Sequence, residues 1–117
     1  MTATFTSKTL KELGKNIFFL DSACSPTATV FNCKDLVKMH WNSDKEEATT
    51  TLGGGYRAPY SADISYFGVQ DYDDELPMSV ISWSWFERTL KAKVSEPSST
   101  GVRSITFSHI PVVLYVS

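Results

Sequence analysis

The sequence lacks a long apolar run, and no stretch approaches the roughly 20 consecutive apolar residues that a membrane-spanning helix needs. Residues 1–8 contain no apolar segment of the kind that secretory signal peptides carry, so we expect a cytoplasmic protein without a membrane span. A basic surplus is absent too. The 117 residues carry a formal net charge of −2, and this disfavours a nucleic-acid partner, because a nucleic-acid-binding face must neutralise phosphates.

Cysteine is scarce, with two residues, Cys24 and Cys33. A disulfide between them would close a hairpin-like loop, but a cytoplasmic setting favours two reduced thiols. Their spacing does not match a zinc knuckle, and the sequence adds only two histidines, His40 and His109. The sequence therefore predicts no metal site and no cofactor.

What the sequence does contain is an ordinary globular composition, with 42% hydrophobic and 21% charged residues. This length and composition indicate a single domain over residues 1–117. Short alternating segments are separated by turns rich in Gly, Pro, Ser and Asp, which is typical of a mostly β fold. We predict an antiparallel β-sandwich or barrel with one short N-terminal helix at residues 7–14. The alternative, an α+β fold, requires a helix over residues 79–93.

Residues 76–94 form the stretch around which the fold is expected to be organised. Ile81, Trp83 and Trp85 alternate with two serines, a pattern typical of a half-buried strand. We therefore expect a core strand here, with Ile81 and Trp83 buried. The alternation changes phase just after Trp85, which predicts a β-bulge at that point.

The remaining strands are expected where β-branched or aromatic residues alternate with polar ones. They cover residues 16–20, 28–33, 35–41, 48–52, 62–69 and 102–117. Polar or acidic turns separate them at residues 42–47, 70–75 and 95–101. Near the N-terminus, an extended arm over residues 2–6 is the alternative to the short helix. In the last segment, the apolar residues 112–116 could lie at a sheet edge and pair with a neighbouring molecule.

Catalytic patterns are weak. His40 and His109 are the candidate general bases, and no spacing brings a cysteine beside either of them. The Gly-x-Ser-x-Gly turn of serine hydrolases does not occur. The acidic segment 71–75 offers clustered carboxylates, but it lacks the glycine and the final glutamate of a calcium-binding EF-hand loop. No catalytic residue is predicted.

Tyrosine and arginine gather in and beside two loops, and these residue types are typical of contact surfaces. The first loop, residues 53–60, begins with three glycines, whose backbone N–H groups could also hold an anion beside the guanidinium. Loops displayed on a β scaffold are common places for binding. The sequence predicts a ligand-binding surface for a protein partner or a glycan, made by Tyr56, Arg57, Tyr60, Asp71 and Tyr72.

Residues 51–54, Thr-Leu-Gly-Gly, followed by residues 67–72, Phe-Gly-Val-Gln-Asp-Tyr, are similar to a pair of segments in the fungal fruit-body lectins. These lectins are β-sandwiches related in fold to the actinoporins. The basic and aromatic residues that follow the second segment in that family are absent here. The resemblance implies a sandwich that binds a sugar or a lipid headgroup.

The leading hypothesis is a non-enzymatic, β-rich binding module that uses the Gly/Tyr/Arg loop surface. The first alternative is a self-assembling structural subunit of a viral or other assembly, a homo-oligomer in which residues 112–116 supply the contact. The second alternative is a small hydrolase.

Overall fold

The computed structural model describes residues 2–5, 17–21, 29–43 and 56–116. Four features expected from the sequence lie outside the described residues: the helix at 7–14, the strand at 48–52, Cys24 and the glycines at 53–55. Among the helices that are described, none has the length and apolar character needed to cross a membrane.

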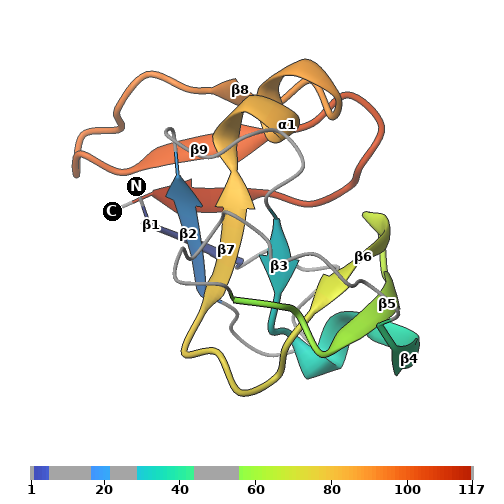
Figure 1. Ribbon diagram of the computed structural model, residues 1–117. Coiled ribbons are helices and arrows are strands. Elements are labelled where there is room, and N and C mark those ends of the chain that lie inside the picture. The colour runs from blue at the N-terminus through green and yellow to red at the C-terminus, as the bar shows by residue number, and fades with distance from the viewer. Residues whose placement is uncertain (1, 6–16, 22–28, 44–55, 117) are drawn as a thin grey trace.

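The described chain is mostly β, as the sequence predicts (Figure 1). Its strands are β1 Thr2–Phe5, β2 Ile17–Asp21, β3 Val30–Phe31, β4 Val37–Asn42, β5 Tyr60–Ile64, β6 Gly68–Tyr72, β7 Ser79–Ser82, β8 Lys93–Val94, β9 Arg103–Thr106 and β10 Leu114–Val116. The helical segments are a 3-10 turn at Lys34–Leu36 and α1 at Trp83–Arg88. α1 lies inside residues 79–93, where the α+β alternative requires a helix, but it covers only six residues, and the described fold is mostly β.

The strands pair into one sheet in the order β4-β5-β6-β3-β7-β2-β1-β10-β9-β8. Most neighbours run antiparallel, but β2 with β7 and β3 with β6 run parallel, so the sheet is mixed. β7 lies in the middle of this order, and all four of its residues are buried. β4 and β8 are the two ends, so the described strands do not close into a barrel.

The stretch predicted as one long core strand is a strand followed by a helix. β7 ends at Ser82, whose Oγ accepts a hydrogen bond from the Trp85 backbone N–H at 3.3 Å and so caps the first turn of α1. The predicted bulge is therefore wrong, because the change of phase marks a switch from a period of 2 to one of about 3.6 residues. Ile81 is fully buried, as expected. Trp83 is only partly buried, and Phe86 takes the core position in α1 instead.

The segment predicted as one strand over residues 62–69 belongs to two strands, β5 and β6, joined by a tight turn. The Phe67 N–H donates to the Ile64 carbonyl at 3.0 Å, and Tyr66 adopts a left-handed φ of 71°. This turn leaves the Tyr66 side chain exposed. The acidic turn predicted at residues 70–75 begins later, after the end of β6.

Residues 112–116 do not lie at a sheet edge, so that prediction is wrong. β10 pairs with β1 on one side and with β9 on the other. Val112 and Leu114 are buried in the core. Because both neighbouring positions in the sheet are filled, this segment cannot accept a strand from another molecule.

Aromatic rings connect the two ends of the sheet through the core. Phe86 stacks on Phe67, with ring centroids 6.0 Å apart, and meets Phe107 edge-on at 5.1 Å. Phe67 lies in the turn between β5 and β6, and Phe107 directly follows β9. A single fully buried side chain on α1 therefore touches both halves of the sheet.

Candidate binding surface

The five residues predicted to bind a ligand do not converge on one point. Tyr60 and Tyr72 are directly opposite each other across β5 and β6, so their side chains share one face of the sheet. Asp71 is the neighbour of Tyr72 in β6 and therefore faces the other side. Tyr56 and Arg57 lie in the segment that leads into β5. The predicted surface is thus divided by the sheet itself.

Three aromatic rings pack together on the Tyr60 face. The His40 ring on β4 lies 5.0 Å from that of Tyr60 and 5.8 Å from that of Tyr72, and the two tyrosine rings are 6.1 Å apart. Exposure decreases along this cluster, from exposed His40 through half-buried Tyr60 to buried Tyr72. Burial also raises the pKa of Tyr72. Tyr72 therefore supports the cluster from the core, and His40 and Tyr60 are the members that a ligand can reach.

The Tyr56 side chain is hydrogen-bonded to the turn that follows β6. Its hydroxyl donates a hydrogen bond to Asp73 Oδ2 at 2.7 Å. Burial, followed by the nearby carboxylate of Asp73, raises the pKa of Tyr56 well above its ordinary value. The other oxygen of Asp73 accepts the Glu75 backbone N–H at 3.1 Å. Tyr56 and Asp73 together fix this turn, which is a structural task.

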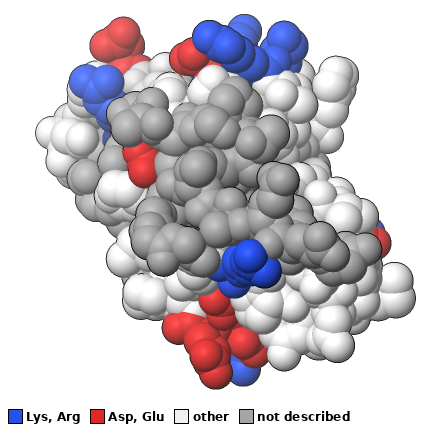
Figure 2. Space-filling view, in the orientation of Figure 1, with Lys and Arg blue, Asp and Glu red and all other residues white. Residues whose placement is uncertain are grey.

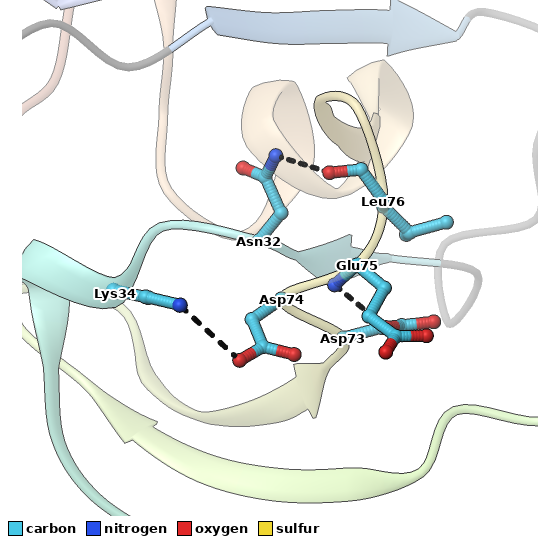
Figure 3. A network of polar contacts seen from close by, with 6 residues as sticks. All are labelled: Asn32, Lys34, Asp73, Asp74, Glu75 and Leu76. Carbon is cyan, nitrogen blue, oxygen red and sulfur yellow. Dashed lines mark hydrogen bonds and ion pairs between the residues drawn. The ribbon is translucent and has the colours of Figure 1, made fainter.

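Polar contacts hold the turn that contains the acidic segment 71–75 (Figure 3). Lys34 Nζ lies 3.7 Å from Asp74 Oδ2, and the Asn32 side-chain amide donates to the Leu76 carbonyl at 2.9 Å. Figure 2 shows acidic side chains gathered at the end of the molecule where β7 begins. Within the described ranges, no three His, Cys, Asp or Glu side chains lie close enough together to hold a metal ion.

Cys33 is a free thiol that lies in a buried polar network. Its sulfur lies 3.5 Å from Asn32 Oδ1 and 3.3 Å from Ser79 Oγ, and Ser79 Oγ donates to the same Asn32 oxygen at 3.0 Å. Burial raises the pKa of Cys33 from 9.0 to about 11. Reactive cysteines are exposed and have lowered pKa values, so this thiol has the opposite character. Cys33 therefore gives the hydrolase hypothesis no nucleophile.

β4 carries the most exposed surface at this end of the sheet. Five of its six residues, from Lys38 to Asn42, are exposed. Met39 and Trp41 project from one face and are 62% and 40% exposed, although large apolar side chains are usually covered. The backbone N–H of Ser43 donates to the Pro59 carbonyl at 3.0 Å, which holds the end of β4 beside the segment containing exposed Arg57.

Sequence reasoning missed the part played by β4. The alternation of Met39 and Trp41 with charged and polar neighbours was visible, but it does not reveal which strand ends a sheet. The strand pairing supplies this information. β4 pairs with β5, where Trp41 lies opposite Ser61 and Asn42 lies opposite Tyr60. We name the surface formed by Met39, Trp41, His40, Arg57 and Tyr60 the β4 edge surface.

No family model, curated protein or solved structure matches the chain. The resemblance to the fungal fruit-body lectins finds no support in these comparisons, and the function has to be argued from the surface itself.

Proposed function

We propose that the protein is a non-enzymatic, β-rich binding module that takes up an extended segment of a protein partner along β4. The observation that supports this proposal is the position of β4 at the end of the sheet with five of its six residues exposed. A terminal strand offers backbone N–H and C=O groups that can pair with an added strand.

The side chains of β4 suit such a partner because they lie on both faces of the strand. Met39 and Trp41 form an apolar strip on one face, while His40 packs against Tyr60 on the other. An added strand alternates its own side chains in the same way and contacts both faces at once. A glycan, by contrast, would contact one of these faces only.

The start of β4 limits the register that a partner can adopt. The pairing with β5 shifts between Val37 and Met39, which interrupts the regular ladder there. The regular part of the strand is therefore Met39–Asn42. Exposed Arg57 lies beyond its end and can form paired hydrogen bonds with a carboxylate of the bound segment.

The test compares capture by two exposed substitutions. Wild-type protein, Trp41→Ala, Arg57→Ala and the double variant are immobilised and used to capture proteins from the native source, with the retained species identified by mass spectrometry. We expect a species that the double variant binds at least about tenfold more weakly, a loss of roughly 1.4 kcal/mol or more.

The matched control is the pair Glu87→Ala and Arg88→Ala, which are exposed residues on α1. Exposed substitutions usually change the free energy of unfolding by less than about 0.5 kcal/mol, so all variants should remain folded. Tyr60 is left intact because it packs against the core. Equal capture by the wild type and the folded double variant would refute the proposal.

Self-assembly is the second candidate, because the described sheet has two different ends, β4 and β8. Pairing of β4 in one copy with β8 in the next would be head-to-tail and would give open chains. Sedimentation of the purified protein separates the two candidates. A large oligomer that Trp41→Ala dissociates would favour assembly, and a monomer would favour the binding module.

A further inference from the structure

An open hollow lies at the end of the sheet opposite to β4, and six of the eight residues that line it are polar or charged. Its volume is about 390 Å3. Its lining comes from the loop that joins β8 to β9, from β9 and from Tyr115 of β10. Figure 1 shows where β8 and β9 lie in the fold. Chemically distinctive side chains line it: Ser95, Glu96, Ser98, Thr100, Arg103 and Tyr115.

Strand register explains why an aromatic ring opens into this hollow. Ile105 and Leu114 are opposite each other across β9 and β10, and both are fully buried. Their neighbours Ser104 and Tyr115, which are also opposite each other, must therefore face outward. The Tyr115 side chain is 40% exposed, so one face of its ring is available for contact.

The loop wall is held in place by short hydrogen bonds. The Ser98 N–H donates to the Val102 carbonyl at 2.9 Å, and the Gly101 N–H donates to the Ser98 carbonyl at 2.9 Å. Gly101 has a φ of 81°, a conformation that favours glycine. The Ser95 hydroxyl accepts the Ser104 N–H at 2.8 Å. The hollow is thus shaped before any ligand arrives, which reduces the entropy lost on binding.

The hydroxyl groups keep hydrogen-bonding capacity for a ligand. A hydroxyl has one donor and two acceptor positions. Ser98 Oγ and Thr100 Oγ1 lie 2.9 Å apart and share one hydrogen between them, so the second hydroxyl hydrogen can be donated elsewhere. Ser95 Oγ accepts one hydrogen bond and donates another to the Glu96 carbonyl at 3.1 Å, which leaves it one further acceptor position.

The hollow is lined by one charge of each sign. Arg103 would attract an anion, but the carboxylate of Glu96 lines the same space and opposes it. The reverse holds for a cation. Both groups are planar and can form two parallel hydrogen bonds, a geometry that fits two neighbouring hydroxyls. The Tyr115 ring adds an apolar face for C–H groups.

From these features we propose that the hollow binds a neutral saccharide, with Tyr115 stacking on the ring of the sugar and Arg103 and Glu96 holding its hydroxyls. The volume lies toward the small end of ligand pockets and suits one or two sugar units. This site is separate from the β4 edge surface. It also shares no residue with segments 51–54 and 67–72, so it does not rest on the resemblance to lectins.

The test uses the full chain labelled with 15N and titrated with glucose, galactose, mannose, N-acetylglucosamine, maltose and lactose up to about 10 mM, a range that detects millimolar binding. At least one sugar should shift the amide signals of residues 95–104 and 114–115 and leave those of β4 and β5 unchanged. Inorganic phosphate at the same concentration serves as the anion probe.

Matched variants identify the contacts. Tyr115→Ala and Arg103→Ala should each weaken binding of that sugar by at least about tenfold, which corresponds to 1.4 kcal/mol. Tyr115→Phe keeps the ring and should bind within about threefold of wild type, or 0.7 kcal/mol. Tyr66→Ala and Arg88→Ala are similarly exposed controls and should bind normally.

Three results would overturn the proposal: no shift with any sugar, shifts that Tyr115→Ala leaves unchanged, or shifts at these amides with phosphate alone. None of these results bears on β4, so failure here and failure of the proposed function remain distinguishable.

Discussion

The two ends of the sheet use the same strand alternation to present different chemistry. At the β4 end, the outward positions hold apolar and aromatic side chains such as Met39 and Trp41. At the β8 end, the outward positions of β9 and β10 hold Ser104 and the exposed ring of Tyr115, and the loop after β8 adds further hydroxyl groups. An apolar edge strand suits an extended polypeptide, and a polar hollow suits a small hydroxylated ligand. A β scaffold with one core can therefore carry two separate surfaces.

The largest effect should come from the buried residue that packs between the β5–β6 turn and the segment after β9. Phe86 is fully buried and touches both Phe67 and Phe107. Phe86→Ala removes a buried ring and leaves a cavity, so it should lower the free energy of unfolding by about 3–5 kcal/mol. Urea denaturation measures this change.

Trp83→Ala is the internal comparison, because Trp83 lies in the same helix but is only partly buried. Its cost should be clearly smaller than that of Phe86→Ala. If both substitutions lowered the free energy of unfolding equally, Trp83 would have the core position predicted from the sequence, and Phe86 would not be the main core residue of α1.

Much of the β structure could be predicted from the sequence, because alternation and turn residues act locally. The strand around residues 17–20 and the loop at 95–101 have the expected positions. The helix α1 was missed because Ser-Trp-Ser-Trp satisfies strand alternation, and tryptophan and serine are weak helix formers. The available signal was Ser82, a residue type that favours the N-cap of a helix.

The surfaces were harder to predict because they depend on pairing between distant segments. β4 is exposed where it ends the sheet of described strands, and Ser104 and Tyr115 come together in the hollow through the pairing of β9 with β10. The parallel pairing of β2 with β7 joins segments far apart in the chain. Local patterns carry no information on such long-range register. Arg57 and Tyr60 were identified from residue type alone, and their role as ligand contacts remains a proposal.

The next prediction concerns neighbouring residues of β10. Leu114 is fully buried and Tyr115 is 40% exposed. Leu114→Ala should therefore cost about 2–5 kcal/mol of stability. Tyr115→Ala should cost clearly less than that, since 40% of the residue's surface is already exposed in the folded protein. Thermal and urea unfolding of both variants measure the difference. A Leu114→Ala protein as stable as wild type would contradict the burial of Leu114 in the core.

Alkaline pH should act on the β4 end of the molecule. Among the described residues, the groups with a raised pKa, Cys33, Tyr56 and Tyr72, all lie there. A pKa raised in the folded state means that the folded protein binds more protons, so stability is lost as the pH rises. For Cys33 this loss begins near pH 9 and continues through about pH 11. It should amount to about 2–3 kcal/mol.

Denaturation of wild type and Cys33→Ala across this pH range tests the effect. Cys33→Ala will be less stable at every pH, because it leaves a cavity and removes a partner of Ser79. The informative quantity is the slope of stability against pH, which should be shallower in the variant. Cys33 is not among the groups that raise the pKa of Tyr56, so the contribution of Tyr56 is the same in both proteins. The Cys33 thiolate also raises the pKa of Tyr72, so the change in slope reports Cys33 together with its coupling to Tyr72. Identical slopes would show that the thiol does not titrate in a buried site.

The smallest effect separates a structural tyrosine from the proposed contacts at the β4 end. Tyr56 was predicted as a ligand contact, but its hydroxyl donates to Asp73 Oδ2 at 2.7 Å. Tyr56→Phe removes a hydrogen bond to a carboxylate from a half-buried position while keeping the ring, so it should cost about 1.5 kcal/mol, the low end for bonds to charged groups. Tyr66→Phe, at an exposed turn, should cost nothing measurable. Capture of the partner should be unchanged in both variants, whereas Arg57→Ala weakens it. A Tyr56→Phe protein that kept full stability but lost capture would show that the hydroxyl contacts the partner. Tyr56 would then belong to the contact surface and not to the structural turn.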